Sequence, residues 1–189
     1  MKKLSLILWV LGLSACSFYS PKSQFYVLKS ENLPAVSDKA LNVTVTKVNV
    51  PDMLDKSQMV IYDEDSSEVQ ILEFHRWAEG LPEVLQTTIT NDLMAYLPHS
   101  YIERGYFAGS TSQYSVNVKI NAIAAYKGDK VVLSAWWNIK NKEGKIVARR
   151  QKDYVVKPKD NSIAALVDAQ AEAVHQMSQE IAATLLEQK

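Results

Sequence analysis

The spacing of apolar residues changes twice along the chain, and each change predicts a different kind of element. Stretches in which β-branched and aromatic residues alternate with polar ones are typical of half-buried strands. Such stretches stand before residue 75 and again after residue 114, where the turns Gly128-Asp129 and 141–144 divide three of them into a predicted meander. The expected strands cover 24–28, 41–50, 59–62, 69–74, 115–126, 130–139 and 145–156.

Two other segments carry apolar residues at three- and four-residue steps, which indicates amphipathic helices. The first helix is predicted between Pro82 and Pro98 and the second from residue 163 to the end, with Asn161 or Ser162 as its cap. Both apolar stripes need a surface to cover. We therefore predict an α+β fold, a two-layer sandwich of a mostly antiparallel sheet with the two main helices packed on one face.

The first sixteen residues form a separate unit. Lys2 and Lys3 precede an apolar run over 4–13, and Ser14 and Ala15 stand before Cys16. This run is too short to span a bilayer, which takes about 20 residues, and the layout is that of a secretory signal. Because Leu13-Ser14-Ala15-Cys16 resembles the bacterial lipobox, we predict a signal peptide over 1–15 and a lipid on Cys16.

The chain after the signal is expected to form one anchored domain. Residues 16–24 form a polar tether that extends at most about 25 to 30 Å, and 25–189 are expected to form a single periplasmic domain. Ser17 lacks the aspartate that retains lipoproteins of enteric-type bacteria at the inner membrane, which by analogy predicts the outer membrane. The processed chain has two fewer basic than acidic residues, a balance that does not favour nucleic acid.

Motifs for catalysis or metal binding do not stand out in the sequence. His75, His99 and His175 have no ligand spacing around them, and 109–112 reads GSTS rather than G-x-S-x-G. Phosphate and dinucleotide loops do not occur either. We expect no cofactor, no metal and no enzymatic activity, although an acid–base pair assembled by folding stays open.

Three tryptophans are the candidate contact residues. Trp77 stands in RWAEGL, and Trp136 and Trp137 are neighbours in a predicted strand. Adjacent strand residues point to opposite faces, so one indole of the pair is expected in the core and the other on the second face. There it either packs under a loop of the same chain or binds a partner protein or lipid.

The order of several motifs resembles the ABC-type transport auxiliary lipoproteins, also described as membrane integrity-associated transporter subunits. The resemblance rests on LSAC, QFYVL, VNVPDML leading into MVIY, RWAEGL, and GDKVVLSAWWNIKNKEGKIV. It implies an outer-membrane lipoprotein that acts, without catalysis, with an MCE-domain protein in moving lipids across the envelope. It also implies docking at the far end of that partner and a possible homo-oligomeric ring. Trp77 and Ala78 match the family's motif.

Two alternatives have a different biochemical character. In one, the domain is a periplasmic carrier that holds an acyl chain between helices and sheet, near Met59, Met94 and Met177. Methionines at such positions are more often core filler. In the other, the protein is a structural lipoprotein that supports envelope integrity without a transport partner.

Overall fold

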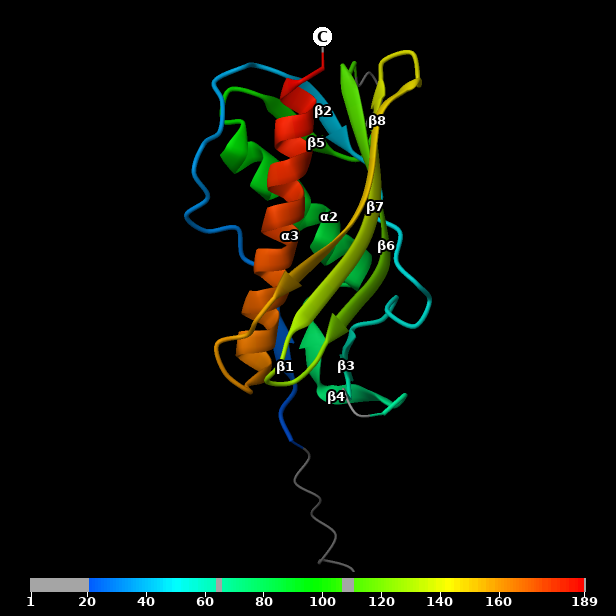
Figure 1. Ribbon diagram of the computed structural model, residues 1–189, viewed down its shortest axis with the longest axis vertical. Helices are drawn as coiled ribbons and strands as arrows, with labels where there is room; N and C mark the ends of the chain where they lie inside the picture. The colour runs from blue at the N-terminus through cyan, green and yellow to red at the C-terminus, as the bar shows by residue number, and fades with distance from the viewer. Residues whose placement is uncertain (1–20, 64–65, 107–110, 189) are drawn as a thin grey trace, which may run out of the picture.

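Residues 21–63, 66–106 and 111–188 are described by the computed structural model. Figure 1 shows its two helices side by side against one face of a long, curved sheet. The elements are, in chain order, β1 (Gln24–Tyr26), β2 (Asn42–Val45), β3 (Gln58–Tyr62), β4 (Val69–Trp77), α2 (Leu81–Tyr96), β5 (Tyr101–Arg104), β6 (Tyr114–Ala125), β7 (Val131–Asn141), β8 (Ile146–Val156) and α3 (Ile163–Leu186).

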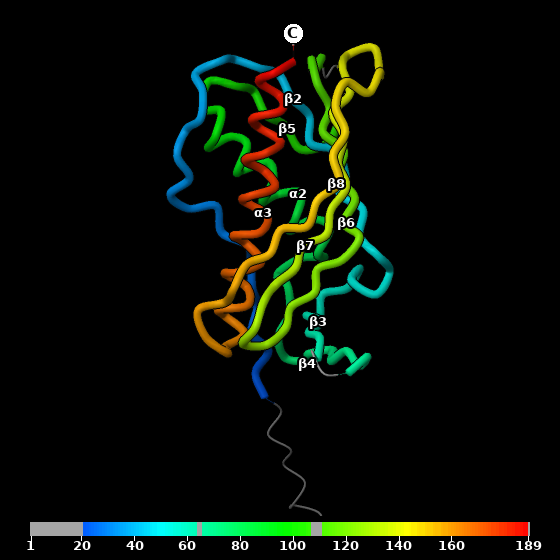
Figure 2. Tube along the Cα trace, viewed as in Figure 1, coloured from blue at the N-terminus to red at the C-terminus, as the bar shows by residue number. Residues whose placement is uncertain are grey.

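The predicted meander is confirmed as β6, β7 and β8, which pair antiparallel in sequence order. Gly128 and Gly144 lie in the two connecting turns with φ of +80° and +77°. Residues other than glycine rarely adopt this left-handed backbone conformation. Both turns therefore depend on glycine at these positions. Figure 2 shows the three strands curving together along most of the length of the molecule.

The expected single sheet is divided into two mixed sheets, with strand orders β5-β2-β6-β7-β8 and β1-β4-β3. β2 runs parallel to both β5 and β6. β2 ends at Val45, and after Pro51 the chain turns away, so that β3 approaches the far end of β6 instead of extending β2. An isolated bridge joins Asn49 to Lys119 of β6, and another joins Tyr62 to Tyr126, just after that strand.

β5 is the one strand that the apolar pattern does not predict. It has four residues, of which only Ile102 and Glu103 are buried, and four residues are too few to show an alternation. The predicted hairpin of 59–62 and 69–74 is confirmed as β3 and β4, with β4 extending to Trp77.

Both helices begin where the sequence indicates. Gly80 and Pro82 mark the start of α2, and proline suits this position because the first helical N–H groups need no intrahelical partner. α3 begins after Ser162, whose hydroxyl oxygen accepts a hydrogen bond of 3.1 Å from the N–H of Ala165. Of the two predicted caps, Ser162 is therefore the one used.

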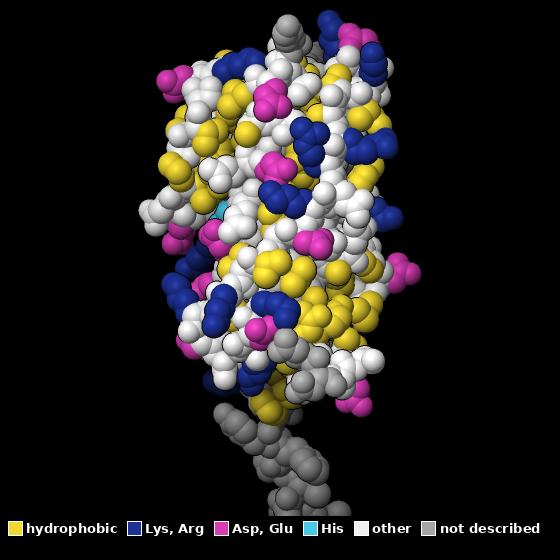
Figure 3. Space-filling view, viewed as in Figure 1, with side chains coloured by type: hydrophobic (Ala, Val, Ile, Leu, Met, Phe, Trp, Pro, Cys, Tyr) yellow, Lys and Arg dark blue, Asp and Glu magenta, His cyan; other side chains and the backbone are white. Residues whose placement is uncertain are grey.

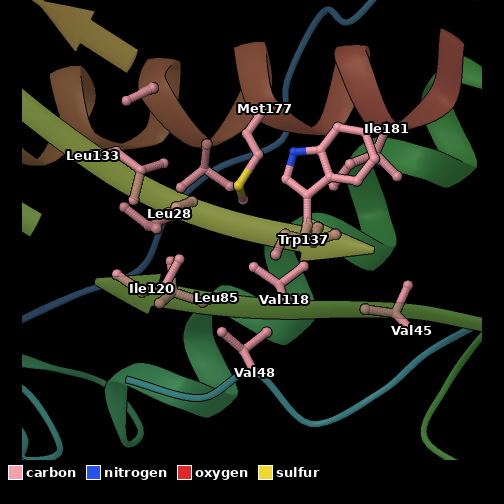
Figure 4. Close-up of a cluster of buried hydrophobic side chains, with 14 of the residues drawn as sticks. Leu28, Val45, Val48, Leu85, Val118, Ile120, Leu133, Trp137, Met177 and Ile181 are labelled. Carbon is pink, nitrogen blue, oxygen red and sulfur yellow. The ribbon is translucent and has the colours of Figure 1, made fainter. Parts of the chain in front are cut away.

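The core lies between the helices and the inner face of the sheets. α3 packs over β7 and β8, and α2 over β5 and β2, so both helices cover the same face. Figure 4 shows Trp137 of β7 reaching toward Met177 and Ile181 of α3, with Val118 and Ile120 of β6 beside it. All five side chains are buried. The α+β class and the shared helix-covered face are confirmed.

The membrane anchor is placed by sequence alone. Cys16 and the signal 1–15 lie outside the described residues, and of the tether 16–24 only the part from residue 21 is described. Over the described ranges, neither helix combines the length and apolar character needed to cross a bilayer.

Candidate functional site

The three candidate tryptophans occupy two kinds of environment. Trp77 ends β4 and is buried in the main core, and Trp137 is fully buried under α3. Trp136 points to the opposite face of β7, which the helices leave uncovered, and is half-buried there. Docking by these side chains stays a prediction, but Trp136 is the one that reaches the surface.

The neighbours of Trp136 are set by strand register. Lys119 of β6 and Gln151 of β8 lie directly across from it. Arg149, two residues back along β8, places its guanidinium carbon 5.4 Å from the indole centroid, a distance typical of a cation–π contact. We call Lys119, Trp136, Arg149 and Gln151 the Trp136 surface.

A row of polar side chains supports the Trp136 surface at one side. Asn117 and Asn138, paired across β6 and β7, approach at 3.4 Å between Nδ2 and Oδ1. The hydroxyl of Thr46 donates to Oδ1 of Asn117 at 3.1 Å and lies 3.1 Å from the carbonyl oxygen of Val116. These contacts tie the segment after β2 to the sheet and hold this side of the surface in place.

The side chains of the Trp136 surface are of the kinds that bind partner proteins. An indole and a guanidinium are the side chains most enriched among residues that dominate protein interfaces, because both present flat, weakly hydrated faces with donors at the rim. Lys119 and Arg149 are exposed and both are basic. The surface therefore suits a partner that offers an apolar or aromatic side chain flanked by carboxylates.

A buried electrostatic contact lies elsewhere, between the two helices. Nδ1 of His175 lies 2.9 Å from Oδ2 of Asp92, and the Asp92 side chain is fully buried. Burial lowers the pKa of His175, but the net pKa is raised, because the hydrogen bond with Asp92, the charge of that carboxylate, a hydrogen bond with the backbone of Lys29 and the charge of Glu172 all favour the protonated ring. The imidazolium is thereby favoured, and it holds α2 against α3.

Tyr96 shares this inter-helix contact. Its hydroxyl donates to the carbonyl oxygen of His175 at 3.2 Å, and burial together with the charge of Asp92 raises its pKa to about 12. Asp92 is not among the residues that the sequence singles out. The sequence feature that could have identified Asp92 is its position as a carboxylate within the apolar stripe of a helix, three residues after Ile89 and four before Tyr96.

Each of the other two histidines contacts one side chain from a distant part of the sequence. Nδ1 of His75 lies 2.8 Å from the hydroxyl of Tyr26, and Nε2 of His99 lies 3.5 Å from Asp38 at the surface. In the part of the chain that the structure describes, no three His, Cys, Asp or Glu side chains are grouped so that they could hold a metal ion.

The three methionines of the carrier alternative are scattered. Met59 and Met177 are buried in the core, and Met94 is 45% exposed on α2. The space beside Met59, between Trp77 and Ile123, has a volume of about 10 Å³, which is room for about one water molecule. An acyl chain does not fit there without rearrangement of the core.

Comparison with known proteins places this geometry in a family. The model of the ABC-type transport auxiliary lipoprotein component matches residues 26–182. No curated protein matches the chain. Among solved structures, one described only as an uncharacterized protein is 22% identical with a TM-score of 0.73, and it covers 87% of this chain and 99% of its own.

Two further structures are similar. Protein XCC0632 from Xanthomonas campestris is 14% identical with a TM-score of 0.67, covering 86% of this chain and 95% of its own. The PelC dodecamer from Paraburkholderia phytofirmans is 12% identical with a TM-score of 0.48, covering 77% and 91%. The family match spans most of the chain, from β1 to the last turns of α3. This chain belongs to the ABC-type transport auxiliary lipoprotein family.

Proposed function

We propose that this protein is a non-enzymatic accessory subunit of an MCE-type intermembrane lipid transport system. In this proposal acylated Cys16 anchors it at the outer membrane, and the Trp136 surface docks the periplasmic end of the MCE protein. The observation that carries the proposal is the outward indole of Trp136 beside the exposed guanidinium of Arg149, on the face that the helices leave open.

Anchoring rests on the lipobox and on the family. Family members are lipoproteins that act as auxiliary transport components, and Leu13-Ser14-Ala15-Cys16 is the proposed acylation motif of this chain. Ser17 favours the outer membrane. The lipid would hold the domain within about 30 Å of the bilayer, because β1 begins only eight residues after Cys16.

A non-enzymatic role is supported by how the titratable side chains are used. His175 and Asp92 bind each other between the helices, and His75 contacts Tyr26. These contacts serve packing, whereas a general base needs an open approach for a substrate. The family description as an auxiliary component points the same way.

The test is capture of the partner from envelopes. The full-length lipoprotein would be purified from detergent-solubilised membranes after mild crosslinking, with Cys16→Ser and Trp136→Ala variants alongside. A Lys142→Ala variant in the exposed β7–β8 turn is the matched control. We expect an MCE protein with the unmodified chain and the control, and at least about tenfold less with Trp136→Ala, as for a central interface tryptophan.

The Cys16→Ser variant separates anchor from surface. Recovery of the MCE protein with this variant would assign the affinity to the folded domain alone, and its loss would show that docking needs the tether. Recovery with none of the proteins would contradict the proposal and favour the carrier or the structural role. Native mass spectrometry then identifies a carrier by its bound lipid. On the family resemblance, we also propose that several copies of this protein form a ring around the partner. Native mass spectrometry tests this by giving the number of copies in the complex.

A further inference from the structure

Several apolar side chains in and next to the three-stranded sheet are exposed. Phe25 is 65% exposed, Ile71 43% and Phe74 42%. Val27, just after β1, and Val69 of β4 are exposed as well. We call these five residues the end patch. Single exposed apolar residues are common, but a group on one small sheet marks a contact surface.

Strand register shows which of these side chains turn away from the core. Ile71 pairs with Val60 and Val69 with Tyr62, while the alternate residue Met59 points into the core. Val60 is 7% exposed and belongs to the core, so this face is buried on β3 and exposed on β4, at Ile71 and Val69. On β1, Phe25 pairs with Arg76, which pairs with Gln58 on the same face as Val60. The shift in register between Gln58 and Met59 leaves Phe74 opposite no residue of β3.

The end patch lies where the chain from the anchor enters the domain. Figure 1 shows β1, β3 and β4 at one end of the molecule, opposite the β7–β8 turn, and the described chain begins at that end, just before β1. Figure 3 shows hydrophobic side chains gathered over the same end of the visible face. Phe25 stands nine residues after Cys16, so a fully extended chain places it within about 30 Å of the lipidated residue.

We propose that the end patch rests on the phospholipid bilayer that holds the anchor, with Phe25, Ile71 and Phe74 in the headgroup region. This inference rests on acylation of Cys16 in the proposed function. The short tether selects the bilayer as occupant, because it keeps this end of the domain close to the membrane surface. The exposed Lys22, two residues before β1, supplies a basic group that a lipid phosphate can pair with. Arg76 lies in the same region, but its guanidinium is 3.5 Å from the carboxylate of Glu73.

Contact through the end patch gives the domain an orientation. The β7–β8 turn then points away from the membrane. The Trp136 surface lies midway along β7, between the two ends of the meander. A lipid anchor alone leaves the domain free to swing on its tether. A second, apolar contact restricts that motion and presents the Trp136 surface at a fixed height above the bilayer.

The test uses fluorescence quenching in vesicles. Cys16 is the only cysteine, and acylation blocks its thiol, so an Ile71→Cys substitution in the full acylated protein can be labelled uniquely with a bimane. The protein is reconstituted in phosphatidylcholine vesicles that contain a lipid with a nitroxide near the headgroup end of its acyl chain. The matched control carries the label at Lys142→Cys in the exposed β7–β8 turn.

We expect the label at residue 71 to lose most of its fluorescence and the label at residue 142 to keep it. An unquenched label at 71, in protein that floats with the vesicles, would overturn the proposal. That result together with shielding from aqueous iodide would assign the end patch to a protein contact, and iodide access would show a free surface.

Failure of the anchor gives a different result. If the protein does not float with vesicles, or its intact mass lacks acyl chains, the anchor of the proposed function is wrong and the bilayer contact falls with it. Circular dichroism of both labelled variants controls for folding, which is expected to be unchanged because both positions are exposed.

Discussion

Trp136 and Trp137 are adjacent in one strand and have opposite environments. Trp137 is fully buried between β7 and α3, whereas Trp136 lies half-buried beside Arg149 on the uncovered face. The side-chain alternation of a strand produces this difference without any change in the backbone. One indole therefore contributes to stability, and its neighbour is available for recognition.

A similar division holds for the sheets as wholes. The inner face of β6 and β7 is closed by two helices, and its residues Val118 and Ile139 are buried. The outer face of β4 has no such cover, and Ile71 and Phe74 remain exposed. Apolar residues on the covered face are explained by packing alone. For those on the uncovered face we propose external partners, a protein at Trp136 and lipid at the end patch.

The greatest loss of stability is expected on the covered face. Trp137→Ala removes a buried aromatic side chain and leaves a cavity, so it should lower the free energy of unfolding by about 3–5 kcal/mol. Trp136→Ala should cost less than about 1 kcal/mol, because its ring is already partly hydrated. Urea denaturation of both variants measures this difference. Equal losses would contradict the assignment of the two faces.

Removing the buried carboxylate between the helices should have the next largest effect. Asp92→Ala leaves the imidazole of His175 without its partner at 2.9 Å, and breaking a buried ion pair costs about 3 kcal/mol or more. Urea denaturation at pH 6 measures the loss. A loss under about 1 kcal/mol, within the range of surface substitutions, would show that the pair does not hold the helices together.

The same pair predicts a pH dependence. The pKa of His175 is raised in the folded protein, so its contribution to stability is fully present below about pH 6.5, the pKa of an unfolded histidine. That contribution is lost as the pH rises through the raised value. Urea midpoints should fall in the unmodified protein as the pH rises from slightly acid to alkaline, and this component of the slope should be absent in His175→Gln. If the urea midpoints of the unmodified protein and of His175→Gln changed equally with pH, this role of His175 would be refuted.

A smaller effect is expected at the start of α3. Ser162→Ala removes the acceptor for the N–H of Ala165, which should lower the free energy of unfolding by about 1 kcal/mol. Ser162→Asp supplies another acceptor at the same place and should restore most of this loss. Thermal or urea unfolding of the two variants tests the cap. If Ser162→Ala left the free energy of unfolding unchanged, that result would argue against a stabilising cap.

The smallest effect on folding is expected at the end patch. Ile71→Ser replaces a side chain that is 43% exposed, and the stability should change by about 0.5 kcal/mol or less. The flotation of an unacylated Cys16→Ser protein with vesicles should nevertheless fall when Ile71→Ser is added. A large loss of stability instead would mean that Ile71 packs in the domain and is not kept for an external contact.

Local signals in the sequence account for most of the fold. Two apolar periods, the turns at Gly128 and Gly144, and the cap at Ser162 predict the meander and both helices correctly. The separation into two sheets depends on where the segment after Pro51 meets β6, which is a long-range contact without a local pattern. β5 escapes prediction because four residues carry too little periodicity.

The candidate site is predictable only in part. Alternation predicts that Trp136 and Trp137 diverge, and the structure shows which of them is buried. Counting along β8 from the turn at 141–144 does not find Arg149, because the pairing shifts by one residue between Ile139 and Lys140 and brings Gln151 rather than Arg150 opposite Trp136. Asp92 and His175 are 83 residues apart, so no spacing rule connects them, although a carboxylate on an apolar helix stripe is itself a signal.

Site-specific photo-crosslinking in intact cells would decide whether the uncovered face docks a protein. A photoreactive amino acid replaces Gln151, which is exposed directly across from Trp136, or Ile71 or Lys142 of the acylated protein, and the adducts are identified by mass spectrometry. The predicted result is an adduct with an MCE protein at position 151, an adduct with phospholipid at position 71, and neither at position 142. An absence of any protein adduct at 151, with the MCE protein present, would contradict the assignment of this face to docking.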